Sequence, residues 1–418
     1  MHNPTASPTR LFYGWWITFS AFLNLFFTVG IVYYGYPVFY PSLVESLGFT
    51  RAQVTQGFLY GFVVVGLVLG FLAGVLIDRF GPREVIRFGI GFVGLSMVAM
   101  GWMTTLWQYY ALCITEVVGY VLTGPIPNQV LISNWFRARR GRAMGVAYLG
   151  LGAGGAVAPL LIGGLIERVG WRQAFIIVGI LILVVLFPVA QWLTRSKPSE
   201  LGLEVDGTSQ VGEGTPAAAT PSVDWRSATR SRNFWLIIGG ATLTIGAIGT
   251  VSQHLILFLK DQQFVTAQAT RMASGLLIAS LAGRVIVGYY ADRFSKKNVM
   301  ALFYLLLGLA IPLLFLAPNR IAIWAFVVIF GFAMGADYML IPLVTAECFG
   351  LAALGKLLAL IIMGYSLGQW FAPWIAGKIF DTYKSYDLAW LIMTTAGILG
   401  AAIIYCIRPE DAAKSGQR

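Results

Sequence analysis

The sequence predicts an all-α membrane protein of twelve transmembrane helices, arranged as two six-helix pseudo-symmetric bundles. Hydrophobic residues make up 58% of the chain and charged residues only 11%, whereas a soluble domain carries about 25% charged residues. The mean hydropathy is +0.75, and 48 of the 418 residues are glycine, which lets transmembrane helices pack closely. Short sequence patterns also recur at a fixed offset of 214 residues, which indicates a duplicated half.

Apolar segments long enough to cross a bilayer recur along the whole chain. Short polar loops separate most of them, so consecutive segments are predicted to cross the membrane in opposite directions. The twelve predicted spans are residues 14–41, 52–77, 84–105, 107–135, 141–166, 172–194, 233–259, 266–291, 298–317, 320–347, 352–379 and 386–407.

The longest polar interruption follows the sixth span and contains Ser, Pro, Gly and Glu. A segment of this composition cannot bury enough apolar surface to fold independently, so we interpret it as a flexible cytoplasmic linker. The predicted domains are an N-terminal six-helix bundle at 1–194, the linker at 195–232 and a C-terminal six-helix bundle at 233–418.

The two halves share their clearest pattern at a junction between helices. Gly74 to Phe80 matches Gly288 to Phe294, and Ala158-Pro159 matches Ala372-Pro373. Parallel repeats of six helices are related by an axis along the membrane normal, and the substrate site lies between them near the midplane. The repeat therefore predicts a central site between the two bundles.

The net charge of +11 reflects membrane topology. If both termini are placed on one side, twenty of the 29 Lys and Arg residues fall on that side and eight on the other. Basic residues are enriched in cytoplasmic loops, so we expect a multi-pass protein of the cell membrane with both termini in the cytoplasm. The lipid bilayer is the expected surrounding, and no nucleic-acid partner is expected.

The sequence carries no recognisable pattern for enzyme chemistry. Three scattered cysteines and two histidines suggest neither a disulfide framework nor a metal centre. No nucleophile–base arrangement and no phosphate-binding loop is evident either. We therefore expect a protein that is not an enzyme and that uses no cofactor.

One basic residue, Arg284, falls near the middle of the eighth span. A charged side chain at the centre of a transmembrane helix costs about 2.5–3.5 kcal/mol on insertion scales. Such a residue usually faces a cavity, a partner or a substrate path. We interpret Arg284 as a fixed cation for an anionic ligand; the alternative is a permanent pair with a carboxylate of another helix.

The loop after the second span, Gly74-Val-Leu-Ile-Asp-Arg-Phe-Gly-Pro-Arg83, resembles the signature loop of the major facilitator superfamily, and Gly288 to Lys297 resembles its weaker repeat. In that family, the Asp and Arg of the motif make contacts between the halves that break as the transporter opens inward. Glu347, near the cytoplasmic end of the tenth span, is assigned to the same inner gate. The gating residues that the resemblance implies in the two loops are Asp78, Arg79, Arg83, Asp292 and Arg293.

Three stretches resemble the monocarboxylate transporter and oxalate/formate antiporter branch of that superfamily. They are Phe12-Tyr-Gly-Trp-Trp16, Gly283-Arg-Val-Ile-Val-Gly288 and parts of the segment from Ala346 to Asp381. In that branch an Arg of the eighth helix binds the substrate carboxylate. The resemblance therefore implies this role for Arg284.

Two departures from the branch narrow the expected substrate. Tyr365 stands where oxalate antiporters carry a second cation, and Tyr34 aligns with a Lys of animal monocarboxylate carriers. One mid-membrane cation can offset one carboxylate, but a second buried carboxylate would have no counter-charge and would be costly. The expected substrate is therefore a small monocarboxylate such as lactate or pyruvate.

Polar and aromatic residues at a similar depth are expected to line the substrate pocket. Proton coupling also needs a titratable group in a desolvated place, because burial and a nearby charge together control its protonation. The substrate-binding candidates are Arg284, Tyr34, Tyr33, Asn128, Tyr338 and Tyr365, and the proton-coupling candidates are Asp337, Glu116 and His254.

We hypothesise that Asp337 pairs with Arg284 when the site is empty, and that protonation of Asp337 releases Arg284 for the anion. The alternative is a permanent pair that holds the eighth and tenth helices together. The function that we expect is proton-coupled symport of a lactate- or pyruvate-like monocarboxylate by alternating access. An anion antiporter of the formate or oxalate type and a non-transporting anion sensor stay open as alternatives.

Overall fold

The computed structural model describes residues 12–137, 139–207, 225–317, 319–335, 337–350 and 354–408. The first six predicted spans all fall on helical segments. These segments are α1 (Gly14–Leu25), η1 (Phe26–Tyr33), η2 (Tyr36–Val38), α2 (Tyr40–Leu47), α3 (Arg51–Gly61), η3 (Phe62–Gly66), α4 (Leu67–Phe80), α5 (Pro82–Met100), α6 (Leu106–Thr123), α7 (Pro125–Trp135), α8 (Arg140–Pro188) and η4 (Val189–Leu193).

Two local features of this half follow from its sequence. Gly170 has a φ of +82°, a conformation that favours glycine, and it turns the chain between the fifth and sixth spans within α8. The segments η1 and η3 are π-helical, a widened helix that often occurs at functional sites. Both interrupt their spans well inside the bundle, so they bear on the region where a site is expected.

The last six predicted spans also fall on helical segments. These segments are α10 (Arg232–Asp261), α11 (Thr266–Arg293), α12 (Lys296–Ala310), η7 (Ile311–Leu316), α13 (Arg320–Met334), α14 (Asp337–Phe349), α15 (Leu354–Tyr383) and α16 (Asp387–Tyr405). Two findings go beyond the prediction. The tenth span is divided into α13 and α14 around Gly335, and the predicted linker contains the helical turns η5 (Pro198–Leu201), η6 (Val205–Gly207) and α9 (Trp225–Arg230).

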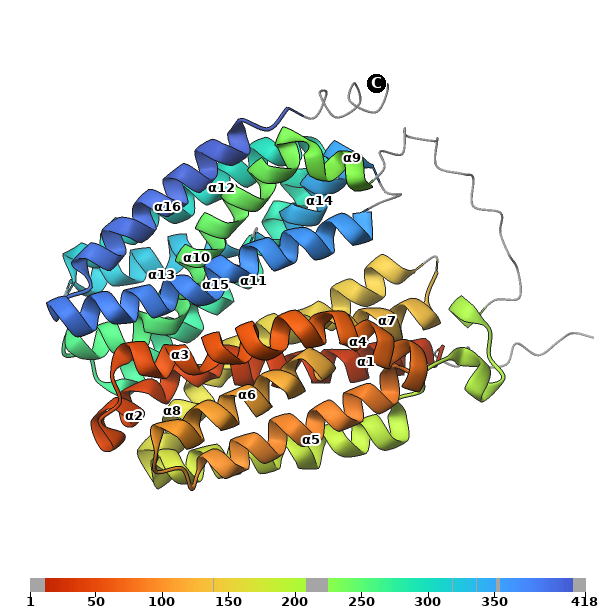
Figure 1. The fold of residues 1–418 in the computed structure, drawn as a ribbon, viewed down its shortest axis with the longest axis horizontal. Helices are drawn as coiled ribbons and strands as arrows, with labels where there is room; N and C mark the ends of the chain where they lie inside the picture. The colour runs from red at the N-terminus through yellow and green to blue at the C-terminus, as the bar shows by residue number, and fades with distance from the viewer. Residues whose placement is uncertain are drawn as a thin grey trace, which may run out of the picture.

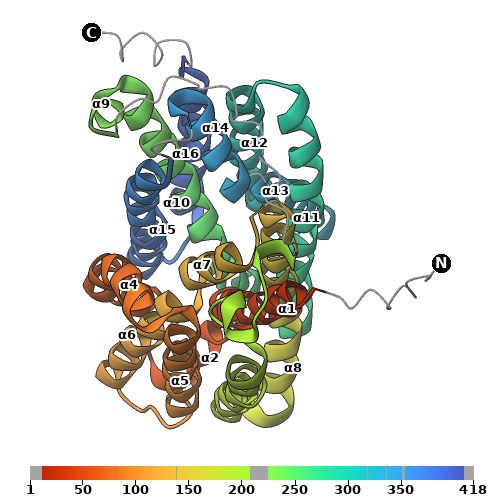
Figure 2. The same cartoon turned by 90° about the vertical axis from the view of Figure 1, so that its right-hand side faces the viewer.

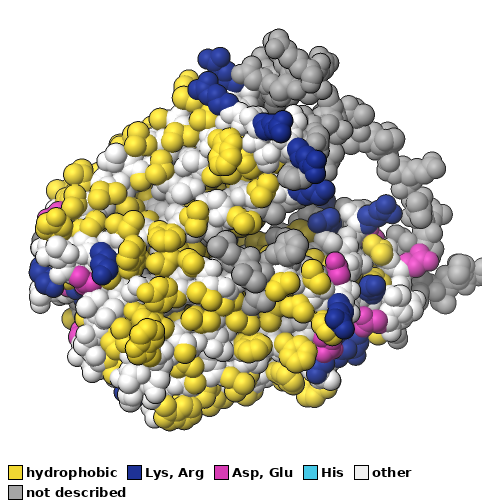
Figure 3. Space-filling view, viewed as in Figure 1, with side chains coloured by type: hydrophobic (Ala, Val, Ile, Leu, Met, Phe, Trp, Pro, Cys, Tyr) yellow, Lys and Arg dark blue, Asp and Glu magenta, His cyan; other side chains and the backbone are white. Residues whose placement is uncertain are grey.

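The outer surface has the character of a membrane protein. Within the described ranges, seven helices are long and apolar enough to cross a membrane. Large apolar side chains are strongly exposed, among them Trp107 at 79% and Ile321 at 82%, and hydrophobic side chains cover much of the flank in Figure 3. Soluble monomers rarely expose such continuous apolar surface. The chain is therefore a multi-pass membrane protein of the all-α class, as predicted.

The helices form two groups, which we call the N-terminal half (α1–α8) and the C-terminal half (α10–α16). Figure 1 shows the N-terminal half below and the C-terminal half above, with most helices running along the same direction. We call the end where α5, α10 and α12 begin the linker end, because the linker segments lie there. The opposite end, where α3, α11 and α16 begin, is called the far end.

Glycines bring the two halves into close contact over part of their length. A Cβ atom built at Gly163 of α8 would lie 2.7 Å from Thr270 of α11, and one at Gly155 would lie 3.1 Å from Leu277. On the other side of the molecule, a Cβ at Gly377 of α15 would lie 2.7 Å from the backbone of Ala52 in α3. These positions belong to the far end and the middle, so the halves are tightly joined there.

Toward the linker end the two halves separate. Gly145 and Gly141 continue the stripe of α8 on which Gly152 and Gly155 lie, since residues three and four apart share one helix face. Gly152 still meets Leu281 of α11, but no atom lies within 4 Å of a Cβ built at Gly145 or Gly141 in the described structure. Figure 2 looks onto the linker end, and Figure 3 shows the surface hollowed between the two halves at this end. The molecule is closed at the far end and open at the linker end.

Candidate functional site

Arg284 lies where the two halves begin to separate. It follows Leu281 by three residues and so continues the face of α11 that meets α8 through Leu277 and Leu281. The residue is half-buried, and no ion pair or side-chain hydrogen bond joins it to any other described residue. A guanidinium carries five N–H donors in a fixed fork. Within the described residues, these donors therefore have no side-chain partner.

The backbone of Arg284 lies against the break in the tenth span. A Cβ built at Gly335 would lie 2.7 Å from the backbone nitrogen of Arg284, and Asp337 begins α14 two residues later. The side chains of Asp337 and Tyr338 lie outside the described residues. The structure therefore places the main chain of the tenth span beside Arg284, and the predicted Asp337–Arg284 pair stays a hypothesis.

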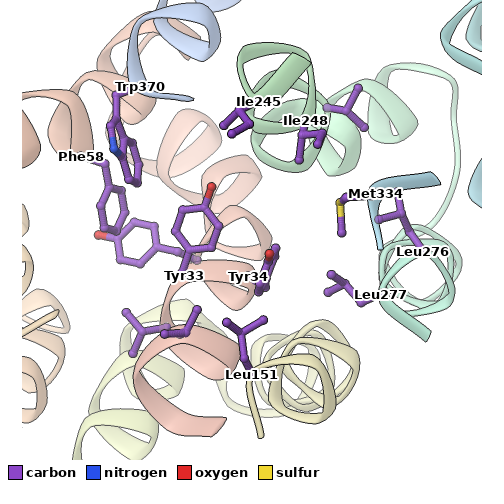
Figure 4. Packing of buried hydrophobic residues seen from close by; sticks show 14 of the residues in the cluster. Tyr33, Tyr34, Phe58, Leu151, Ile245, Ile248, Leu276, Leu277, Met334 and Trp370 are labelled. Atoms are coloured by element: carbon purple, nitrogen blue, oxygen red, sulfur yellow. The ribbon is translucent and has the colours of Figure 1, made fainter. Parts of the chain in front are cut away.

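Aromatic and aliphatic side chains from both halves meet in the middle of the molecule, in a region that we call the central space. Figure 4 shows Tyr33 and Tyr34 projecting into it, with Leu151 below, Leu277 and Met334 on one side and Trp370 and Phe58 on the other. Leu277 precedes Arg284 by seven residues, which is about 10 Å along an α-helix. The central space therefore lies within about two helical turns of Arg284 on α11.

Trp370 is the main contact of the C-terminal half with the aromatic wall of the N-terminal half. Its ring lies parallel to that of Phe62, with the centroids 3.9 Å apart and an interplanar angle of 15°, and it meets Tyr33 edge-on at 5.7 Å. The neighbouring Gln369 donates a hydrogen bond of 2.9 Å from Nε2 to the Tyr33 hydroxyl.

Further tyrosines lie close to this wall. Tyr120 of α6 meets Phe62 edge-on, with the ring centroids 5.6 Å apart, and Tyr365 is buried. Tyr33 and Tyr34, which the sequence predicts as site residues, meet edge-on with the ring centroids 4.9 Å apart, and the part of Tyr365 in the site stays a prediction. Tyr120 was not predicted, because a tyrosine in an apolar span gives no signal of which way it faces.

Asn128 is engaged within the N-terminal half. Its Nδ2 donates to the carbonyl oxygens of Thr123 at 2.6 Å and Gly124 at 2.8 Å, and its Oδ1 accepts from Asn24 at 3.2 Å. Pro127 has no N–H, so the Thr123 carbonyl would otherwise lose its helical donor. The Asn128 amide thus replaces helical hydrogen-bond donors that are missing between α6 and α7. The role of Asn128 in substrate binding stays a prediction.

A set of polar contacts joins the two halves at the far end. Arg51, the first residue of α3, makes a bidentate ion pair with Asp261 at the end of α10 and donates at 3.0 Å to the Tyr386 hydroxyl. The guanidinium lies 3.6 Å from the centre of the Phe380 ring, and the Arg51 side chain is only 11% exposed. Arg51 of the N-terminal half is therefore enclosed by side chains of the C-terminal half.

Two more contacts strengthen this closure. The carboxylate of Asp381 accepts hydrogen bonds from the backbone N–H groups of Arg51 at 3.1 Å and Ala52 at 3.0 Å, so an acid of one half caps a helix of the other. Tyr40 donates at 2.7 Å to Gln253. We call the set formed by Tyr40, Arg51, Gln253, Asp261, Asp381 and Tyr386 the far-end gate.

His254 lies next to this gate and not beside Arg284. Its ring is fully buried, with Nδ1 2.8 Å from the Tyr386 hydroxyl and Nε2 2.8 Å from the carbonyl oxygen of Pro373. Glu116 lies elsewhere, inside the N-terminal half near Tyr36 and Cys113. Both Glu116 carboxylate oxygens are buried without a hydrogen bond from the described residues. The three proton-coupling candidates therefore occupy three separate places.

The gating residues implied by the signature loop lie at the open linker end. Asp78, Arg79 and Glu347 are exposed. Arg83 donates to the carbonyl oxygens of Ala190 and Gln191 within its own half. Arg293 is exposed, and the side chain of Asp292 lies outside the described residues. Within the described part of the chain, Asp78, Arg79, Arg83 and Glu347 make no ion pair or side-chain hydrogen bond between the two halves.

The far-end gate was missed in the sequence, although two weak signals were present. Thr50-Arg-Ala-Gln53 is a capping box that begins α3, so its exposed N–H groups could have been anticipated. Asp261 and Asp381 end long apolar spans. Because Arg51 and Asp381 are 330 residues apart, nothing in the sequence indicated that they meet.

A solved structure with the same architecture is known. The chain superposes on a bacterial homologue of the human lysosomal transporter Spinster, in an inward-facing and unoccupied conformation, with a TM-score of 0.71. The identity is 16%, and the match covers 99% of this chain and 98% of that one. At this identity the likeness establishes the fold.

Two relatives with assigned substrates match along most of their length. A probable hexose phosphate transport protein of Chlamydia pneumoniae is 26% identical over 390 residues, covering 86% of this chain and 84% of the relative. A probable L-galactonate transporter of Escherichia coli K12 is 24% identical over 417 residues, covering 93% of this chain and 89% of the relative. Neither is named for lactate, pyruvate, oxalate or formate, so the branch suggested by the sequence is not confirmed.

The superfamily itself is confirmed. The family model described as Major Facilitator Superfamily matches residues 22–276 and 261–418, which together span nearly all of the described structure. The two relatives are named as transport proteins, and the fold is that of a solved transporter homologue. The chain is a membrane transporter, not an enzyme, and it belongs to the Major Facilitator Superfamily.

Proposed function

We propose that this transporter carries a small monocarboxylate together with a proton across the cell membrane by alternating access. The observation that carries the proposal is Arg284, a half-buried guanidinium at the neck of the opening with no ion pair among the described residues. An arginine binds a carboxylate through two parallel hydrogen bonds. A lone cation in this position would be costly unless an anion neutralises it during the transport cycle.

The two relatives with assigned substrates support an anionic cargo. Hexose phosphate and L-galactonate are both anions, and L-galactonate bears a single carboxylate. The central space supports a smaller and less polar cargo for this chain, because Leu151, Leu277 and Met334 form much of its wall. A polyhydroxylated sugar acid would leave many hydroxyl groups without partners against such a wall. A lactate- or pyruvate-like acid fits it better.

We further propose that the linker end faces the cytoplasm, with both termini there. Exposed basic residues of the linker end, including Arg137, Arg140 and Arg142, support this orientation. The structure then corresponds to the inward-open state, and the far-end gate is the barrier toward the outside. The division into two bundles at 1–194 and 233–418, with a linker at 195–232, belongs to the same proposal.

The proposal is tested by uptake of labelled acids into proteoliposomes. We expect an inward proton gradient to drive uptake of lactate or pyruvate, with malonate, oxalate, glucose 6-phosphate and L-galactonate transported much more slowly. Uptake that needs an internal counter-anion and ignores the proton gradient would indicate the antiporter alternative. Binding without uptake in both conditions would indicate an anion sensor, and preferred uptake of glucose 6-phosphate would contradict the proposal.

The wall around Trp370 predicts a limit on the length of the acyl chain. Replacing Trp370 with Leu removes the ring that stacks on Phe62 at 3.9 Å and enlarges the central space. Each methylene that becomes accommodated contributes about 0.8 kcal/mol, which is roughly a fourfold change per carbon. We therefore expect the ratio of hexanoate to pyruvate uptake to rise in this variant.

The control for this prediction is Trp374→Leu. Trp374 lies one turn further along α15, and the ring that it contacts is Phe371 rather than Phe62. The same change in volume at Trp374 should leave the chain-length preference unaltered. Equal shifts in the two variants would show that Trp370 has no specific influence on selectivity.

A further inference from the structure

His254 is connected to the far-end gate by an unbroken series of hydrogen bonds. Nε2 lies 2.8 Å from the carbonyl oxygen of Pro373, which can only accept. Nε2 therefore carries the proton of the neutral ring, and Nδ1 is an acceptor. The Tyr386 hydroxyl, 2.8 Å away, must donate to Nδ1, and its oxygen accepts from Arg51 Nη1 at 3.0 Å.

This arrangement requires the neutral form of His254. A protonated imidazole has an N–H at both nitrogens, so Nδ1 would become a donor to Tyr386. The Tyr386 hydroxyl would lose its acceptor, and its oxygen would then face two cationic donors, His254 and Arg51. A positive charge would also be added beside the guanidinium that holds the gate closed. Protonation of His254 is thus opposed by the closed gate.

The charged and titratable groups around the ring are few. Arg51 faces it from α3, Asp381 from α15 and Tyr386 from the residue preceding α16. A further charged group, Asp261, lies on α10 itself and is paired with Arg51. Arg51 disfavours the charged ring and Asp381 favours it, but Asp381 already accepts two backbone N–H groups.

We propose that His254 is the proton-binding residue that controls the far-end gate: binding of a proton breaks the link through Tyr386 to Arg51 and favours opening at the far end. His254 acts through Tyr386 and is therefore a positioning residue. Its part in coupling rests on the proton-coupled transport proposed above. Acid favours whichever conformation binds the proton more readily. Because the closed gate opposes protonation of His254, acid is expected to favour the gate that is open at the far end.

The test measures the gate directly and needs no substrate. Nitroxide labels are attached at Ser46→Cys and Thr382→Cys, two exposed positions at the far end of the two halves, in a chain with Cys406→Ser, since Cys406 is the exposed cysteine of three. Distances between the labels are recorded in nanodiscs from about pH 8 to about pH 5.5, the range in which an unperturbed imidazole gains its charge.

We expect acid to increase the population with the longer distance, by at most about tenfold per pH unit for one linked proton. His254→Gln, which cannot titrate, and Tyr386→Phe, which keeps the imidazole but removes the connecting hydroxyl, should both lose this response. Glu45→Gln is the matched control, because Glu45 is a titratable partner of Lys260 across the same end, at 4.0 Å. The Glu45→Gln variant should show the same change of label distances with pH as the wild-type gate.

A wild-type gate that ignores pH, or a His254→Gln gate that keeps the full response, would overturn the proposal. A response lost in Glu45→Gln would assign the proton to that carboxylate instead, and would overturn it too. The outcome is separable from that of the proposed function. A pH-dependent gate without monocarboxylate uptake would refute only the function, whereas proton-driven uptake with a pH-independent gate would refute only this assignment.

Discussion

Replacing Arg284 with Ala is expected to reduce monocarboxylate uptake by about two orders of magnitude or more. Removing one partner of a desolvated charge pair costs about 3–5 kcal/mol, and each 1.4 kcal/mol is a factor of about ten. Arg284→Lys keeps the charge but loses the bidentate geometry, so it should retain a small part of the activity. The measurement is initial uptake of labelled pyruvate into proteoliposomes at several concentrations.

The control for Arg284 comes from the same helix. Arg271 is exposed near the far end of α11, so Arg271→Ala removes an equal charge and a similar volume without touching the central space. It should transport like the wild type. Wild-type uptake in Arg284→Ala would remove the basis for a carboxylate substrate, and the architecture would then leave the cargo undefined.

Replacing Arg51 with Ala is expected to open the far end of the molecule. The change removes the bidentate pair with Asp261, the hydrogen bond to Tyr386 and the contact with the Phe380 ring. Hydrogen bonds to charged groups contribute about 1.5–3 kcal/mol each; because Asp261 is 31% exposed, we expect a combined loss of about 2–3 kcal/mol after allowing for solvent screening. Label distances at the far end should shift accordingly.

Lys260→Ala is the matched control for the gate. Lys260 and Glu45 also join the two halves at the far end, but their side chains are 32% and 67% exposed and 4.0 Å apart. Exposed pairs contribute about 0–1 kcal/mol, so this variant should stay closed. If Arg51→Ala were as closed as Lys260→Ala, the gate would depend on apolar packing such as Gly377 against Ala52, and not on the polar contacts of Arg51.

The fold was predictable because one physical constraint acts along the whole chain. A span must be apolar and long enough to cross the bilayer, so each helix is visible in the local sequence. The places where these helices are interrupted could not be predicted from the sequence. The π-helical segments η1 and η3 and the break at Gly335 depend on how neighbouring helices satisfy the backbone, which a single sequence does not show.

A site residue could be predicted from the sequence where its side chain alone carries a large free-energy cost in the membrane. Arg284 drew attention because a mid-membrane charge needs an explanation, and the structure places it at the neck of the opening. Asn128 was expected in the pocket, but its amide serves two carbonyl groups beside Pro127. Arg51 and Asp381 gave no signal, because charges at the ends of spans are common and their significance comes only from their contact.

The most direct test of the central claim is a structure of the transporter determined with bound pyruvate or lactate. We predict both carboxylate oxygens within about 2.7–2.9 Å of guanidinium nitrogens of Arg284, with the acyl chain directed toward Tyr33, Tyr34 and Trp370. A bound acid that lies elsewhere while Arg284 makes no contact with it would contradict the account.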